Sequence, residues 1–257
     1  MSDEYSALDR PDILSFVFYP RRDFTRTPSG AHDHFIPVEE GVSVSCRFYV
    51  NSAGSPSVLY FHGNGEVVSD YDHIAPMYTR LGLNLFVADY RGYGASQGRP
   101  TLSNTVSDAC AVFSGLQGVI RREHYCDAVF VMGRSLGSIS AVEIAYHHQA
   151  EIRGLIIESG FAAFISLLTH LGLSPDSHRI HDSEFPNLAK MRTIASPTLI
   201  MHGENDGLIP ASEAEALFRG SAAADKRLLI IPGAGHNDIM WTGRTMYFRA
   251  LGDFATA

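Results

Sequence analysis

Ser135 occupies a position that is typical of a reactive nucleophile. It is the middle residue of Gly133-Arg-Ser-Leu-Gly137, which follows the apolar run 128–132 and precedes a helical pattern. A G-x-S-x-G segment between a strand and a helix forms a sharp turn that strains the serine backbone and exposes its hydroxyl above the sheet. Glycine is needed on both sides because a Cβ there would collide with the strand–helix crossing. The pattern predicts that Ser135 attacks a substrate; the alternative is an ordinary Gly/Ser turn that opens a helix.

A serine hydroxyl needs a base, and the base needs an acid that orients it. His236 lies in a glycine-rich loop after the buried strand predicted at 227–231, where an imidazole can reach over the sheet edge. Asp206 follows another apolar run, 197–201, and is the predicted acid. Glu158 ends a third predicted strand near the nucleophile and is the competing candidate for the same role.

Attack on a carbonyl also needs hydrogen-bond donors for the oxyanion that develops. The backbone N–H of Leu136, the residue after the nucleophile, is one predicted donor. The loop His62-Gly-Asn-Gly65 follows the apolar run 57–61 and supplies the other. Asn64 is the predicted second donor, and Gly65 is the alternative.

Two further groups of residues are interpreted as structural. The glycine-rich loop 89–94 lacks the spacing of a phosphate-binding loop, so Asp89 or Arg91 is predicted to brace the oxyanion loop beside it. The chain has 12 histidines, but none shows H-E-x-x-H spacing or a companion C-x-x-C pair. We therefore expect no metal site and no cofactor.

The elements that must position these residues alternate along the chain. Residues 42–50 alternate apolar and polar, which predicts a half-buried strand in an antiparallel beginning of the sheet. Parallel strands covered on both faces are predicted at the continuous apolar runs 58–61, 83–88, 129–132, 155–157, 198–201 and 228–231. Helical patterns lie near 69–81, 102–118, 136–149, 211–220 and 237–252. This alternation predicts an α/β fold with a mostly parallel, doubly wound sheet and right-handed crossovers.

One connection is longer than the others. Between residues 160 and 196 an apolar helical stretch is followed by a polar, histidine-rich segment. This insertion is predicted to form a short helical cap over the active site. Phe161, Phe164 and Leu168 are the predicted substrate-binding residues of the cap, whereas Trp241 is expected in the core.

Together these motifs resemble the α/β-hydrolase superfamily, in the serine-hydrolase branch of serine aminopeptidase-like hydrolases and α/β-hydrolase-domain depalmitoylases. The resemblance spans roughly residues 42–251, and the nucleophile, acid and base come in the family's order. The segments that carry it are Phe61–Glu66, Ala88–Ser96, Gly133–Gly137, His202–Pro210 and Gly233–Asp238. The resemblance implies the α/β-hydrolase fold, with Ser135, Asp206 and His236 as catalytic residues and Asn64 and Leu136 as the oxyanion hole.

Length and composition exclude several classes of protein. The 257 residues are 45% hydrophobic, and no repeat or linker marks a second unit. We therefore predict a single domain over 1–257, with its core at about 42–251 and the cap at about 160–196. A net charge of −8 without a Lys/Arg cluster argues against nucleic acid or an anionic membrane surface as a partner.

The chain also lacks the signals of export or membrane insertion. No stretch approaches the ~18 apolar residues of a membrane span, and the amino terminus lacks the apolar core of a secretory signal. Three dispersed cysteines are typical of reduced thiols in the cytoplasm, the expected location: Cys46, Cys110 and Cys126.

The expected activity is that of a serine hydrolase. It would cleave a carboxylic ester, thioester or amide in a small-molecule or acylated substrate through an acyl-enzyme intermediate. Two alternatives stay open: a non-catalytic relative that only binds a ligand, and carbon–carbon bond hydrolysis or acyl transfer on the same site. A dehalogenase or epoxide hydrolase is disfavoured because those relatives have an aspartate where Ser135 stands.

Overall fold

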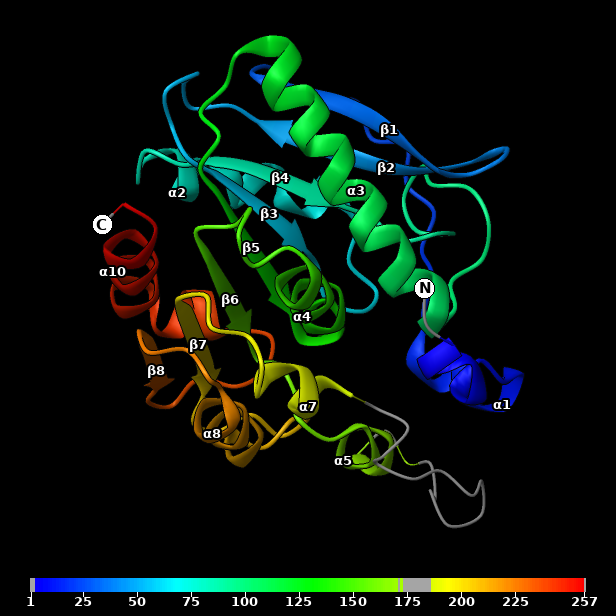
Figure 1. Ribbon diagram of the computed structural model, residues 1–257, viewed down its shortest axis with the longest axis vertical. Helices are drawn as coiled ribbons and strands as arrows, with labels where there is room; N and C mark the ends of the chain where they lie inside the picture. Colours follow the sequence, from blue (N-terminus) through cyan, green and yellow to red (C-terminus); the bar gives the residue numbers. More distant parts are fainter. Residues whose placement is uncertain (1–2, 171, 173–185, 257) are drawn as a thin grey trace.

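The computed structural model describes residues 3–170, 172 and 186–256. At its centre lies one eight-stranded sheet with the strand order β1-β2-β4-β3-β5-β6-β7-β8 (Figure 1). The strands are β1 (Ala31–Glu39), β2 (Val42–Tyr49), β3 (Ser57–Phe61), β4 (Asn84–Ala88), β5 (Val129–Arg134), β6 (Gly154–Glu158), β7 (Thr198–Gly203) and β8 (Lys226–Ile231).

The α-helices in the described part of the chain are α1 (Pro11–Val17), α2 (Ala75–Thr79), α3 (Leu102–Glu123), α4 (Ser138–His147), α5 (Phe164–His170), α7 (Asn187–Met191), α8 (Ala211–Gly220), α9 (Ile239–Thr242) and α10 (Arg244–Ala255). The described residues also form three 3-10 helices: η1 (Asp3–Leu8), η2 (Val68–His73) and η3 (Ser135–Gly137).

The strand pairing confirms the predicted mostly parallel α/β sheet. β2 pairs antiparallel with both β1 and β4, and the remaining five pairs are parallel. Phe61 at the end of β3 pairs with Gly133 of β5, and Arg134 pairs with Glu158 of β6. The carboxyl ends of the parallel strands therefore meet at one edge of the sheet, and the loops that follow them converge there.

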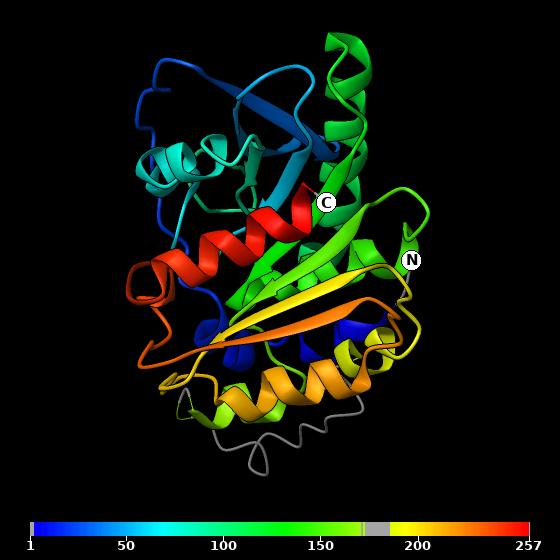
Figure 2. The same ribbon diagram turned by 90° about the vertical axis from the view of Figure 1, so that its left-hand side faces the viewer.

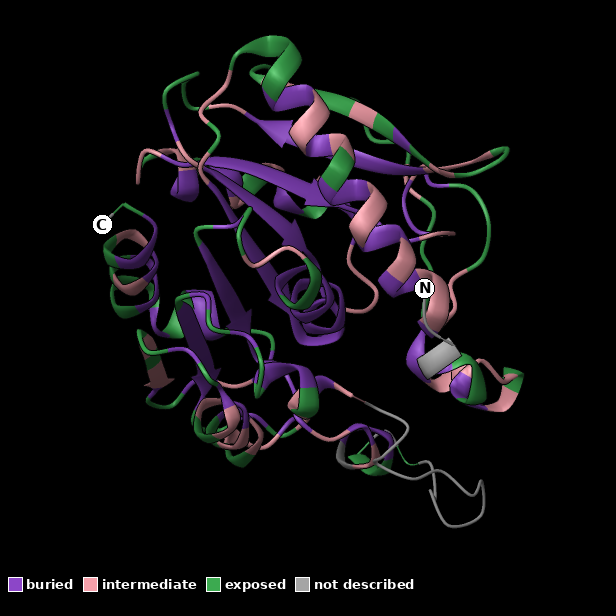
Figure 3. Cartoon of the chain, viewed as in Figure 1, coloured by how far each residue is buried: buried purple, intermediate pink, exposed green. Residues whose placement is uncertain are grey.

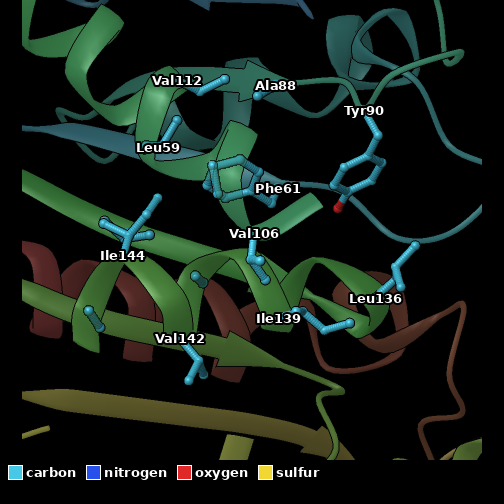
Figure 4. Close-up of a cluster of buried hydrophobic side chains, with 14 of the residues drawn as sticks. Leu59, Phe61, Ala88, Tyr90, Val106, Val112, Leu136, Ile139, Val142 and Ile144 are labelled. Carbon is cyan, nitrogen blue, oxygen red and sulfur yellow. The ribbon is translucent and has the colours of Figure 1, made fainter. Parts of the chain in front are cut away.

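Helices cover both faces of the sheet. α10 crosses one face, and α3 and α4 lie on the other (Figure 2). The strands from β3 to β7 are buried along their length, as continuous apolar runs require (Figure 3). Figure 4 shows part of one layer, where side chains of β3, α3 and α4 pack together, among them Leu59, Phe61, Val106 and Ile144. Each large apolar side chain buried in this way contributes roughly 1.5–3 kcal/mol to stability.

The structure corrects the prediction for residues 42–50. β2 is buried on both faces, because its polar face is covered as well. The guanidinium of Arg47 donates to Asp33 of β1 and to Asp72 of η2, and the Tyr49 hydroxyl donates to the Val68 carbonyl. An alternating pattern indicates a solvent-facing side only when no polar partners cover that side.

Other differences concern the ends of the chain and the cap. β1 and α1 have no counterpart among the predicted elements. Trp241, expected in the core, is 54% exposed on α9. Helix α5 begins the predicted cap, but the middle of that cap, 171 and 173–185, lies outside the described residues.

Candidate active site

Ser135 follows β5 directly and has a left-handed backbone, with φ of +52°. This conformation is costly for a residue with a side chain and is maintained by the surrounding packing. A Cβ on Gly133 would overlap the Gly137 carbonyl, and a Cβ on Gly137 would overlap the Phe61 carbonyl. Both glycines are therefore required by close backbone contact, as expected for a nucleophile elbow.

His236 lies between Ser135 and Asp206. Its Nε2 is 3.0 Å from Ser135 Oγ, and its Nδ1 is 2.7 Å from Asp206 Oδ2. An ionised carboxylate only accepts hydrogen bonds, so Nδ1 carries the proton in the neutral imidazole and Nε2 presents its lone pair. The serine hydroxyl can then donate to Nε2, which is the arrangement that general-base activation of a serine requires.

Asp206 is held as a carboxylate by several donors. Its Oδ1 accepts hydrogen bonds from the backbone N–H groups of Leu208 and Ile209, at 2.9 and 2.8 Å. Its Oδ2 is also 3.3 Å from His202 Nε2. Burial alone would raise the pKa of Asp206, but the hydrogen bonds from His202, His236 and Ile209 keep that pKa well below its usual range. Asp206 is therefore negatively charged at neutral pH.

Glu158, the other candidate acid, contacts different groups. It is fully buried, and its Oε1 accepts a hydrogen bond from Arg134 Nε at 3.2 Å. Its Oε2 accepts from the hydroxyls of Tyr247 and Tyr60, at 2.6 and 3.3 Å. Burial raises the pKa of Glu158, an effect that the Arg134 charge and the Tyr247 hydroxyl offset only in part. The structure thus brings Asp206, and not Glu158, against His236.

The Asn64 side chain is fixed by residues from distant parts of the chain. Its Nδ2 donates to the Val17 carbonyl at 2.7 Å, and its Oδ1 accepts from Tyr19 N–H at 2.9 Å and from the Tyr93 hydroxyl at 2.6 Å. Arg21 Nε also donates to the Gly65 carbonyl, at 3.2 Å. The amino-terminal segment therefore holds the predicted oxyanion loop. No sequence pattern signals this contact, because Val17 and Tyr19 contribute backbone atoms.

Of the two residues predicted to brace the oxyanion loop, Asp89 and Arg91, only Asp89 does so. Asp89 Oδ1 is 3.2 Å from His62 Nε2 and accepts the Val68 N–H at 3.0 Å, so Asp89 supports the beginning of the oxyanion loop. Arg91 instead forms ion pairs with Asp108 and Glu39. Its guanidinium thus links β1 to α3, because Glu39 lies on β1 and Asp108 lies on α3.

Comparison with known proteins places the chain in a family. The model of a hydrolase family described as "Serine aminopeptidase, S33" matches residues 54–171 and 186–240. The α/β-hydrolase domain-containing protein 17B of Homo sapiens is 31% identical over 225 residues, which cover 84% of this chain and 72% of that protein. The chain is an α/β-hydrolase. An uncharacterized protein of Mycobacterium tuberculosis is 30% identical over 90% of this chain and 86% of its own length.

Solved structures share the fold of this α/β-hydrolase. The esterase Pf2001 of Pyrococcus furiosus superposes with a TM-score of 0.76 at 19% identity, covering 92% of this chain and 98% of that one. Est1E of Butyrivibrio proteoclasticus, solved with ferulic acid bound, gives 0.70 at 18% identity, covering 86% and 97%. At these identities the likeness concerns the fold alone.

The predicted substrate-binding side chains of the hydrolase lie in its core. Phe161 and Leu168 are fully buried and Phe164 is 1% exposed, and all three belong to the cluster that packs against α4. Their role as an acyl pocket stays a prediction, since part of the cap lies outside the described residues.

Within residues 3–170, 172 and 186–256, no three His, Cys, Asp or Glu side chains are grouped so that they could hold a metal ion. Among the same residues, no helix combines the length and apolar character needed to cross a membrane.

Proposed function

We propose that this hydrolase cleaves carboxylic esters or thioesters through an acyl-enzyme intermediate formed on Ser135. The observation that carries the proposal is the position of His236, which lies within hydrogen-bond distance of both Ser135 Oγ and Asp206 Oδ2. The strained backbone of Ser135 supports it, because such strain is found where a nucleophile must be exposed.

In the acylation step, Ser135 Oγ attacks the carbonyl carbon of the substrate while His236 Nε2 takes the hydroxyl proton. A bond forms between Oγ and the carbonyl carbon, and the carbonyl oxygen becomes an oxyanion. Backbone N–H groups of Leu136 and Asn64 are the proposed donors to this oxygen. When the intermediate collapses, the bond to the alcohol or thiol breaks, and His236 returns the proton to that leaving group.

Water completes the reaction by the same route. His236 Nε2 accepts a proton from water, whose oxygen attacks the acyl carbon, and the proton then passes to Ser135 Oγ as the free acid leaves. Throughout, the Asp206 carboxylate holds the imidazole in one tautomer and stabilises its cationic form. Esters and thioesters suit this site best because their leaving groups need less protonation than an amine. The esterase names of the structural neighbours are consistent with this choice.

The substrate class is tested with a panel of p-nitrophenyl esters, acyl thioesters and aminoacyl arylamides. We expect turnover of the esters and thioesters with kcat/KM well above that of the arylamides. The predicted apolar cap adds a second expectation, because each buried methylene contributes ~0.8 kcal/mol: kcat/KM rises from acetyl to about hexanoyl esters. A preference for free-amine aminoacyl substrates would instead indicate a peptidase, and absence of all turnover would favour the ligand-binding alternative.

The second oxyanion donor is tested by Asn64→Ala. This change keeps the backbone N–H but removes the side chain that Val17, Tyr19 and Tyr93 hold. Because the N–H is then less well directed, we expect kcat to fall by roughly 10–100-fold, less than the 10²–10³ seen when a donor is lost outright.

Asn84→Ala is the matched control for that change. The Asn84 amide also ties loops together, donating to Ser52 and Ser55 carbonyls at 3.0 Å, but it lies at the amino end of β4, away from the site. It should lower the melting temperature without changing kcat. Equal effects of the two substitutions on kcat would remove Asn64 from the site.

A further inference from the structure

Arg134 occupies the variable position of the G-x-S-x-G segment, directly before the nucleophile. Its side chain is buried at 5% exposure and uses all three of its nitrogens as donors. Nε donates to Glu158, Nη1 donates to Glu66, and Nη2 donates to the loop that contains His236. One guanidinium thus joins four segments of the chain: the elbow, the end of β6, the oxyanion loop and the base loop.

The contact with the base loop involves the base itself. Arg134 Nη2 donates to the backbone carbonyl of His236 at 2.9 Å and to Asn237 Oδ1 at 3.0 Å. His236 is therefore held at two points. Its imidazole contacts Ser135 Oγ, and its carbonyl accepts a hydrogen bond from Arg134, the residue before Ser135. A planar guanidinium fixes the direction of such bonds better than an ammonium group does.

The contact with the oxyanion loop passes through Glu66. Arg134 Nη1 is 2.5 Å from Glu66 Oε1, and Glu66 Oε2 accepts the Gly63 N–H and the Tyr71 hydroxyl, both at 2.8 Å. The approach is close, because a Cβ on Gly63 would overlap Arg134 Nη1. Gly63 immediately precedes Asn64. By fixing the Gly63 N–H, the Arg134–Glu66 pair therefore also restricts the direction in which the Asn64 N–H points.

The charges around Arg134 favour a permanent ion pair. Burial disfavours the ionised form of Glu66, but the Arg134 guanidinium, together with His62 and the hydrogen bonds from Tyr71 and Gly63, lowers the pKa of Glu66 below its usual value. Arg134 itself stays protonated, since Glu66 and Glu158 more than offset its burial and raise its pKa. The Arg134–Glu66 pair therefore stays ionised across the neutral pH range in which a histidine base works.

We propose that Arg134 is a positioning residue of this site: its guanidinium sets His236 relative to Ser135 and, through Glu66, aligns the oxyanion loop. The proposal rests on the acyl-enzyme function proposed above and adds a group that touches neither the substrate nor the reacting atoms. Its effect should be large, because a displacement of about 1 Å at a reacting group costs up to ~10²-fold in rate.

The test compares Arg134→Met with a matched buried arginine. Arg47 is 2% exposed, pairs with Asp33 and Asp72, and donates to the Thr25 carbonyl, so its surroundings resemble those of Arg134 without any contact to the site residues. Arg47→Met should lower the melting temperature and leave kcat unchanged. Arg134→Met should lower the melting temperature similarly and reduce kcat for a p-nitrophenyl ester by ~10²-fold, with KM changed less than about threefold.

A spectroscopic readout separates positioning from folding and needs no substrate. The Nδ1 proton shared by His236 and Asp206 should give a downfield ¹H resonance in the wild-type protein. We expect this resonance to shift or broaden in Arg134→Met and to stay in place in Arg47→Met. Arg134→Lys should recover only part of kcat, because one ammonium cannot hold three partners in a plane.

Each outcome decides the proposal. If Arg134→Met is destabilised but keeps both kcat and the downfield resonance, Arg134 is only structural and the proposal is wrong. If Arg134→Met does not fold, Glu66→Gln replaces it, since it keeps the side-chain shape and removes the charge; unchanged kcat there would overturn the link to the oxyanion loop. Absence of wild-type hydrolysis would contradict the proposed function instead, whereas the resonance would still report on the position of His236.

Discussion

A fluorophosphonate should modify Ser135 alone, and Ser135→Ala should lose ~10⁴–10⁶ in kcat while staying folded. The reason is that His236 Nε2 lies 3.0 Å from Ser135 Oγ and can remove its proton as the phosphorus or carbonyl carbon is attacked. Alanine tolerates the same turn no worse than serine, so the fold should survive. Intact-mass and peptide mass spectrometry locate the label, and circular dichroism checks the fold.

Ser159 provides the control for this prediction. It directly follows the neighbouring strand β6 and also has a left-handed backbone, with φ of +47°. Its hydroxyl is buried without a hydrogen-bond partner among the described residues, and therefore without a base. Ser159→Ala should keep both labelling and turnover. Labelling that persists in Ser135→Ala would move the nucleophile elsewhere.

Asp206→Asn should cost ~10⁴ in kcat, because the wrong tautomer of the imidazole is favoured. The backbone N–H groups of Leu208 and Ile209 require an acceptor at the Oδ1 position, so the asparagine turns its oxygen toward them and its amide nitrogen toward His236. His236 Nδ1 must then accept a hydrogen bond, and the ring proton moves to Nε2, where it faces Ser135. Steady-state kinetics on a p-nitrophenyl ester measure the loss.

Glu158→Gln is the comparison for Asp206→Asn. It keeps the side-chain shape, and the partners of this side chain are Arg134 and two tyrosines, not His236. We therefore expect a far smaller fall in kcat than for Asp206→Asn. The opposite ranking would assign the acid role to Glu158. Melting temperatures of both variants separate a loss of rate from a loss of folded protein.

The sequence by itself determined the features that depend on residues close together in the chain, namely the strands, the turns and the helices. A strand followed by a turn and a helix leaves a local pattern, and so the elbow at Ser135 and the parallel strands could be predicted. The order of the loops follows from the same pattern, because each loop comes after a strand and parallel strands end at one edge. This is why Ser135, Asp206 and His236 could be proposed together before any distance was known.

Only the tertiary structure decided which side chains are partners. Glu158 ends β6 and Asp206 lies in the loop after the adjacent strand β7, with similar sequence signals. The pairing of β5 with β6 places Glu158 beside Arg134 and so gives the two acids different partners. The support of Asn64 by the amino-terminal segment joins residues that are about 45 positions apart through backbone atoms, for which no sequence pattern exists. Hydrogen bonds depend on distances of a few tenths of an ångström, and long-range packing, not local sequence, sets those distances.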